Sequence, residues 1–262
     1  TDPVQGAATG AAFSGLGQIN QPHQQLANRT AYLYGQQQTD KSNIAALQTQ
    51  QSADVAAISD LQANHFANMQ VFTSSGTFKV PAGVSSIWVL VVGGGGGGAG
   101  APVASGDLGA SGGGGGGGAM GVYSVTSGTQ YAATIGSGGG GGASNLDGGP
   151  GGTTSFGSLL SATGGYGGAT APSAQGVSPG GVGSSGSINV TGGDGGVGYA
   201  ISATVVYGGA GGNSAFGLGF GAQGSQGLSR SGAGYGGGGS GGGGVSGDGG
   251  GAGAPGVIIV RW

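Results

Sequence analysis

The sequence predicts an N-terminal α-helical stalk, a trimeric coiled coil, followed by a small β-structure with stacked polyglycine-II-type helices. Three observations support this fold class. Glycine accounts for 75 of the 262 residues, and 68 of those glycines lie beyond residue 92. Apolar residues recur at heptad spacing between residues 26 and 61, and short β-branched runs interrupt the glycine tracts. We therefore divide the chain into an extended attachment arm (1–20), a helical stalk (21–70) and a glycine-rich tip domain (71–262).

The predicted arm has four glycines and no hydrophobic period, which is typical of a segment that docks on another protein. Pro22 suits the first turn of a helix with Asn20 as its N-cap, because proline lacks only a donor that is unpaired there anyway. The stalk helix is therefore expected to start at about residue 21.

The stalk follows one heptad register without a stutter. Its predicted oligomerisation core consists of six apolar residues at the a and d positions: Leu26, Leu33, Ile44, Leu47, Ile58 and Leu61. Polar a and d residues, among them Gln37, Gln51, Asp54, His65 and the terminal d residue Asn68, alternate with these layers. Such a narrow apolar stripe is too thin to stabilise a lone helix, so we expect it to pair with copies of itself in a homotrimer. Gly35 interrupts the pattern, and the alternative is an antiparallel helical hairpin turning within residues 35–40.

From Val71 onward the apolar period changes to two, which predicts strands. The candidate strands share β-branched or aromatic residues bounded by glycine, and they are residues 87–92, 121–127, 130–135, 153–156, 159–163 and 257–261. They contain most of the large apolar residues of this half. We expect them to form one small β core in which the first and last strands are adjacent.

The glycine tracts between these strands have no side chains, so hydrophobic burial cannot order them. Ordering one residue costs about 1–2 kcal/mol of backbone entropy. The tracts are therefore either flexible linkers or segments whose peptide groups pair with one another. An extended threefold helix has no internal hydrogen bonds, so its backbone groups all point outward and bond to close neighbours, which requires glycine at the facing positions. Stacked glycine helices are the prediction.

Composition argues against an enzyme. The chain has no Cys, no Glu and two His residues, so we expect no catalytic residues, no metal site and no cofactor. Only five basic residues are present, which argues against binding nucleic acid. The longest apolar runs, residues 87–92 and 257–260, are too short for membrane insertion.

Two end motifs carry a family resemblance. Residues 72–93 (FTSSGTFKVPAGVSSIWVLVVG) and residues 253–262 (GAPGVIIVRW) resemble the opening and the close of the glycine-rich domain of phage tail-fibre proteins. Residues 131–142 and 153–157 are also similar to it, and residues 21–33 are similar to a segment near the start of phage fibre proteins. The domain is distantly similar to the glycine-rich adhesins of T-even-type long tail fibres.

This resemblance implies a fibre-tip protein of the virion, assembled in the host cytoplasm. Its N-terminus would attach to other tail or baseplate proteins. Loops of the tip would contact a bacterial surface receptor, which could be a protein, a pilus or a polysaccharide. The alternatives are a purely structural fibre, baseplate or decoration protein without receptor binding, and a flat ice-binding protein.

Receptor contacts are expected in the least glycine-rich insertions, which are residues 101–108, 143–147, 169–179, 197–207 and 214–230. The candidate contact residues are four aromatic residues and an arginine: Tyr199, Tyr207, Phe216, Phe220 and Arg230. Exposed aromatic residues beside an arginine are typical of a contact hot spot. The alternative is a packed seam between glycine layers.

Overall fold

The computed structural model describes residues 14–63, 68–102, 109–170, 176–202, 205–221, 229–244 and 247–262. The chain divides into two compact units, Thr1–Gln62 and Ala63–Trp262. The described residues of the first unit form one helix. The second is a mostly β domain of antiparallel sheets.

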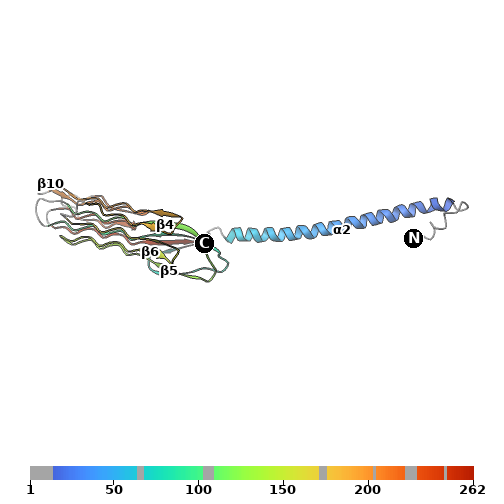
Figure 1. The fold of residues 1–262 in the computed structure, drawn as a ribbon, viewed down its shortest axis with the longest axis horizontal. Helices are drawn as coiled ribbons and strands as arrows, with labels where there is room; N and C mark the ends of the chain where they lie inside the picture. Colours follow the sequence, from blue (N-terminus) through green and yellow to red (C-terminus); the bar gives the residue numbers. More distant parts are fainter. Residues whose placement is uncertain are drawn as a thin grey trace. The chain divides into compact units, whose positions relative to one another are not determined.

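Helix α2 spans Ser14–Ala63 without a break (Figure 1). The alternative of a hairpin near Gly35 is therefore wrong: a glycine inside a helix costs only about 1 kcal/mol, which does not end a helix of this length. The Gly35 carbonyl accepts a hydrogen bond from Thr39 Oγ1 at 3.1 Å. The helix also begins upstream of the predicted cap Asn20, and Pro22 lies inside it.

All side chains of residues 21–59 are exposed in this unit. The predicted core residues Leu26, Leu33 and Leu47 are 64%, 64% and 68% exposed, and Ile44 and Ile58 are each 54% exposed. The side chain of Leu61 and all of His65 lie outside the described residues.

The prediction that Asn68 continues the heptads is wrong. The Asn68 N–H donates to the carbonyl of Trp262 at 3.0 Å, and its carbonyl accepts from the Trp262 N–H at 3.1 Å. The chain leaves the helix before this point because it must enter the first strand.

The first sheet has the strand order β1-β14-β3-β4-β9, and its strands are β1 (Met69–Phe72), β14 (Val257–Arg261), β3 (Ser86–Val92), β4 (Gly118–Ser124) and β9 (Ile188–Val190). The first and last strands of the domain pair directly, with Phe72 opposite Ile258, which confirms that expectation. Strand β4 begins three residues before its predicted start, because Gly118 pairs with Val92.

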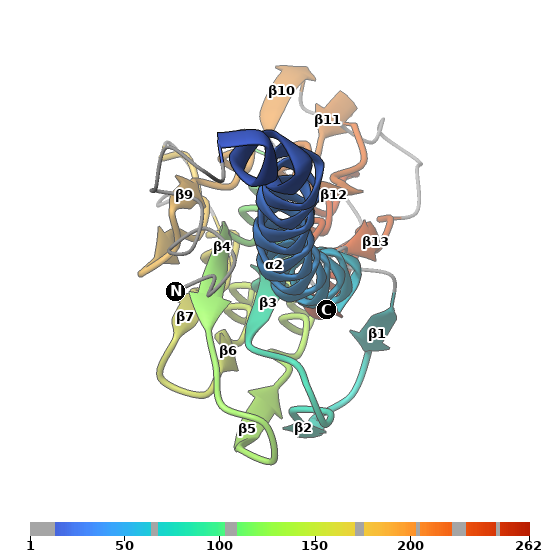
Figure 2. The ribbon, with the colours of Figure 1, turned by 90° about the vertical axis from the view of Figure 1, so that its right-hand side faces the viewer.

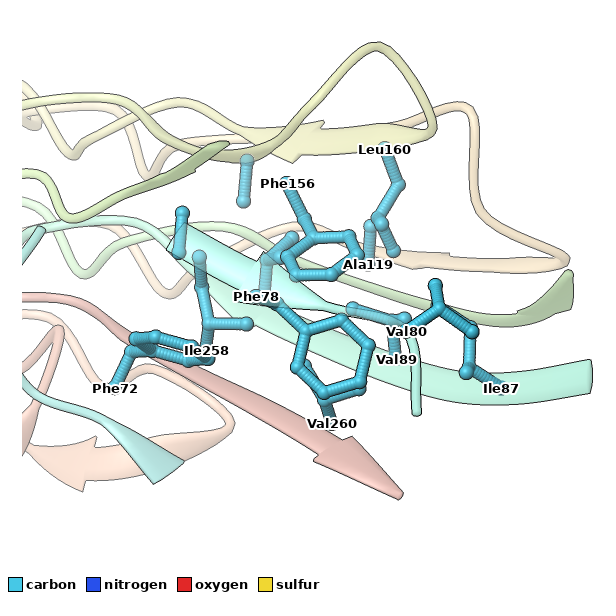
Figure 3. Close-up of a cluster of buried hydrophobic side chains, with 13 residues drawn as sticks. Phe72, Phe78, Val80, Ile87, Val89, Ala119, Phe156, Leu160, Ile258 and Val260 are labelled. Carbon is cyan, nitrogen blue, oxygen red and sulfur yellow. The ribbon is translucent and has the colours of Figure 1, made fainter. Parts of the chain in front are cut away.

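The second sheet has the order β2-β5-β6-β7-β8, and its strands are β2 (Gly76–Lys79), β5 (Gln130–Thr134), β6 (Thr154–Phe156), β7 (Leu160–Ala162) and β8 (Gly183–Ser184). Figure 2 shows β5 and β6 on one side of β3 and β4. The hydrophobic core lies between the sheets (Figure 3). Phe78 is central to it, with ring centroids 5.8 Å from Phe156 and 5.2 Å from Trp262.

Ten extended segments connect the strands and run side by side (Figure 1). We name them g1 (93–101), g2 (109–117), g3 (136–145), g4 (146–152), g5 (163–170), g6 (178–182), g7 (192–198), g8 (208–213), g9 (236–244) and g10 (248–256), and together they form the glycine array. None of these segments is an ordinary β-strand. One isolated bridge joins g6 to g7, and another joins Val182 of g6 to Thr191.

Segment g1 bonds with a period of three residues. Gly96 donates to Gly114 of g2, Gly97 to Gly149 of g4 and Gly98 to Gly251 of g10, all at 2.8–2.9 Å. The carbonyls of the same three residues accept from g9, g5 and g3, respectively. Any three successive residues between Gly94 and Ala99 therefore have all six peptide groups bonded to six different neighbours.

The six neighbours of g1 also bond to one another around a closed ring, in the order g2, g5, g4, g3, g10, g9. Segment g2 has its own ring of g1, g5, g6, g7, g8 and g9. Two fused rings place the segments in three rows: g4–g5–g6, then g3–g1–g2–g7, then g10–g9–g8. The two central segments are thus enclosed on every side by backbone.

This spacing leaves no room for side chains at most interior positions. A Cβ on Gly96 would lie 2.0 Å from the carbonyl oxygen of Tyr166, and one on Gly95 would lie 2.1 Å from that of Gly237. Real Cβ atoms do not approach this closely. Glycine is therefore required for the backbones to come within hydrogen-bonding distance.

Candidate functional site

Among the described residues, the end of the glycine array away from the two sheets includes the turn between g3 and g4 and one hairpin. Strands β10 (Tyr199–Ser202) and β11 (Val205–Tyr207) form the hairpin (Figure 1). It is held to the array by backbone contacts: the Gly244 N–H donates to the Val206 carbonyl at 3.1 Å, and the Val206 side chain is only 4% exposed. A buried central residue fixes this hairpin against g9.

Two of the predicted contact residues meet on this hairpin. Tyr199 and Tyr207 lie opposite each other in the strand register. Their rings stack with centroids 5.1 Å apart and an interplanar angle of 12°. Stacking orders both rings, so they form a rigid aromatic surface.

The turn between g3 and g4 contributes the next part of this end. Asn145 has a left-handed backbone (φ 59°), and Ser144 Oγ donates to the carbonyl of Ala101 at 3.3 Å. Asp147 Oδ1 accepts hydrogen bonds from the N–H and the hydroxyl of Thr170 at 2.7 and 3.0 Å. These contacts fix the turn, and Leu146 at its tip is 60% exposed.

Several apolar side chains at this end of the array are exposed. They come from three loops, and we call the set the far-end surface: Leu146 (60%), Val177 (56%), Val197 (41%), Tyr199 (48%) and Ile201 (68%). Large apolar groups held on a rigid backbone, without a covering element among the described residues, are typical of a contact surface.

The other three predicted contact residues lie elsewhere. Phe216 is in β12 (Phe216–Leu218), which pairs with β13 (Ala233–Tyr235) next to the first sheet. The guanidinium carbon of Arg230 lies 5.4 Å from the ring centroid of Phe220, on the outer side of g8 and g9. The backbone carbonyls of this last pair accept hydrogen bonds from Gly211 of g8 and Ser240 of g9.

The predicted contact residues Tyr199 and Tyr207 lie at this end of the array, and Tyr199 belongs to the far-end surface; their role as receptor contacts stays a prediction. Leu146 and Val177 lie within insertions that were selected as loops, yet nothing in their local sequence distinguishes them from other loop residues. Only the pairing of g3 with g4 and of g6 with g7 brings them to the same end as Tyr199.

Titratable chemistry is sparse. Among the residues that the structure describes, no three His, Cys, Asp or Glu side chains gather closely enough to hold a metal ion. No described helix combines the length and the apolar character that spanning a membrane requires. Burial raises the pKa of the Tyr123 phenol above its ordinary value, and its hydroxyl donates to the carbonyl of Ser185 at 2.9 Å. Tyr123 lies in β4, in the first sheet.

Comparison with known families agrees with this architecture. A family model described as a glycine-rich domain matches residues 73–262. The chain belongs to the glycine-rich domain family. The matched residues of this glycine-rich domain begin just after β1 and include the other four strands of the first sheet, the second sheet and the whole array. No curated protein matches the chain.

Proposed function

We propose that this glycine-rich domain is the tip of a phage tail fibre and that it binds the bacterial host through the far-end surface. The observation that carries the proposal is the group of exposed apolar residues on an ordered hairpin and turn. Loops fixed on a rigid scaffold are where proteins commonly place recognition. The end motifs at residues 72–93 and 253–262, which resemble those of tail-fibre domains, support the same proposal.

The scaffold in this proposal is a stack of polyglycine-II-type helices. Support comes from the three-residue hydrogen-bond period of g1 and g2 and from their six neighbours. A threefold helix rises about 3.1 Å per residue and points its peptide groups in three directions, which is the geometry these bonds need. Backbone hydrogen bonds, each worth about 1 kcal/mol net, would then take the place of a hydrophobic core.

Helix α2 is proposed to be a homotrimeric coiled-coil stalk. Five of its apolar a and d residues are more than half exposed in the single chain, and a long helix that buries no face over residues 21–59 gains no stability from packing. Three copies would cover these residues. They would also present three far-end surfaces, which raises avidity without new contacts.

The N-terminus is proposed to attach to other tail or baseplate proteins, which places the chain in the virion. In this arrangement the chain has no catalytic role. Its receptor is a protein, a pilus or a polysaccharide of the bacterial surface.

An adsorption competition tests the proposal. Purified full-length chain is added to host cells before phage that carry it, and free phage are counted. We expect the chain to block adsorption and the double variant Tyr199→Ser, Ile201→Ser to need at least about tenfold more protein. The matched control substitutes two equally exposed residues of the first sheet, Val122→Ser and Ile188→Ser, which are 55% and 56% exposed.

Each outcome separates the alternatives. A native chain that never competes would indicate a purely structural fibre or cap. A native chain that competes as well as its far-end variant would remove the far-end surface from the proposal.

A further inference from the structure

The two outer faces of the glycine array differ in how they are covered. Outside the g8–g9–g10 row lie two more extended pieces, residues 218–221 and 229–232. The Ser240 N–H of g9 donates to the Arg230 carbonyl at 3.0 Å, and the Gly232 N–H donates to the Ala252 carbonyl of g10 at 2.8 Å. The extended segment 229–232 is therefore held in the seam between g9 and g10, because its carbonyl accepts from g9 and its N–H donates to g10.

The opposite face, formed by g4, g5 and g6, has the same kind of groups without partners. In g5 the N–H groups of Gly164 and Gly167, three residues apart, donate to no residue that the structure describes. In g4 the carbonyls of Gly148 and Gly151, also three residues apart, accept from none of the described residues.

Because the bonding pattern repeats every three residues, the unpartnered carbonyls of g4 and the unpartnered N–H groups of g5 face the same seam. Gly148 and Gly151 donate their N–H groups to Gly168 and Gly165 of g5. Segments g2 and g4 both run antiparallel to g1, so their peptide groups point outward in the same order. In g2, the Gly115 N–H donates to g7, and the Gly115 carbonyl accepts from g6, which is the next segment around the ring. The free carbonyls of g4 therefore face the seam outside g4 and g5. The N–H groups of Gly165 and Tyr166 donate to g1 and g6, respectively, which leaves the free N–H groups of g5 facing the same seam.

A groove of about 510 Å³ follows this face. Its side-chain walls are Pro150, Thr153, Thr163, Tyr166, Pro179 and Val182. Tyr166 is 63% exposed and stands beside the free groups of g5. Pro150 in g4 and Pro179 in g6 have no N–H, so the array offers no donor at these two positions on either side of g5.

We propose that this groove binds one extended glycine-rich peptide segment of a partner chain, in the same threefold conformation as the array. Its carbonyls would accept from Gly164 and Gly167, and its N–H groups would donate to Gly148 and Gly151. Successive contacts would be about 9.3 Å apart, which is three residues of such a helix. The facing positions must be glycine for the reason that holds inside the array. Residues 229–232 on the opposite face show that an extended segment can bond in such a seam, with Gly232 at its donating position. The site is separate from the far-end surface and does not depend on receptor binding.

Hydrogen–deuterium exchange and calorimetric titration of the full chain test the site, with the soluble peptide acetyl-(Gly-Gly-Ser)4-amide as the probe. We expect millimolar probe to slow deuterium uptake in residues 163–168 and to leave residues 130–134 unchanged. A peptide with N-methylglycine in place of each glycine cannot donate at those positions and should bind at least about tenfold more weakly.

Thr153→Trp fills the groove from an exposed position and should abolish the slowed uptake. Thr134→Trp, exposed on β5, is the matched control and should leave it intact. Equal unfolding midpoints of both variants show that loss of binding is not loss of the fold. The proposal is overturned if the probe changes no uptake in residues 163–168, if both peptides bind equally, or if Thr153→Trp binds like the native chain.

Discussion

A Cβ atom added to Gly97 would lie 2.1 Å from the carbonyl oxygen of Gly140, whereas one added to Gly140 would meet no atom within 4 Å. The two glycines face each other across g1 and g3. They therefore differ only in which of them is enclosed, and this makes them a matched pair for testing what holds the array together.

Gly97→Ala should lower the free energy of unfolding by about 3 kcal/mol or more, because the methyl group would force g1 and g3 apart. Gly140→Ala should raise it by about 0.4–1 kcal/mol, because Gly140 does not have a positive φ and alanine reduces the entropy of the unfolded chain. Denaturant unfolding at a constant m-value measures both. Equal effects of the two substitutions would show that close backbone contact is not what stabilises this domain.

The rate of amide hydrogen exchange at each glycine should depend on whether its N–H is hydrogen-bonded and not on the sequence around it. We expect the N–H groups of residues 93–101 in g1 and 111–117 in g2 to exchange only by global unfolding, since each donates to a neighbouring backbone. The outward amides of Gly164 and Gly167 should exchange orders of magnitude faster. NMR exchange on glycine-labelled protein makes the comparison, and uniform fast exchange across g1 would contradict an ordered array.

Leu47→Asp should dissociate the stalk. Leu47 is 68% exposed in the single chain, and burying it in a trimer would contribute about 2 kcal/mol per chain. Sedimentation equilibrium should give three times the 24.0 kDa mass for the native chain and one chain mass for the variant. Ala56→Asp, at an outer heptad position, is the control and should remain trimeric. A native chain that sediments at one chain mass would reject the trimer.

Alkaline pH should destabilise the first sheet through Tyr123. Burial raises the pKa of this phenol in the folded state, so the unfolded chain loses its proton first as pH rises. The contribution of Tyr123 to the free energy of unfolding is fully present below the pKa that its phenol has in the unfolded chain. It is lost as pH rises through the pKa of the phenol in the folded chain. The phenolate also cannot donate to Ser185. Unfolding free energy should therefore fall above about pH 10, and Tyr123→Phe should reduce that fall. An unchanged slope in the variant would assign the effect to other groups.

The local elements could be predicted from the sequence because their signals are local. The period-two run around Ile87 and Val89 indicated β3, and the run ending the chain indicated β14 with its bounds at Val257 and Arg261. Helix α2 was expected from its heptads. Its start was misplaced because Pro22 normally marks a first turn, whereas here the helix continues through it.

The pairings within the array could not be predicted from the sequence, because glycine tracts have no side chains to specify a register. Gly94, for example, bonds to Gly152 and Gly165, and no feature of its neighbours in the sequence distinguishes those partners from any other glycine. The same limit applies to the far-end surface. Tyr199 and Tyr207 were predicted from composition, but the position of Leu146 at the same end of the array depends on which segments are neighbours.

The enclosure of g1 has a consequence for biosynthesis. This segment leaves the ribosome early, yet its bonding partners reach as far along the chain as Ala254. Until that C-terminal stretch has been translated, the bonds of g1 to g10 cannot form, and β14 is missing from its place between β1 and β3. A product that terminates prematurely before residue 248 would therefore lack both g10 and β14.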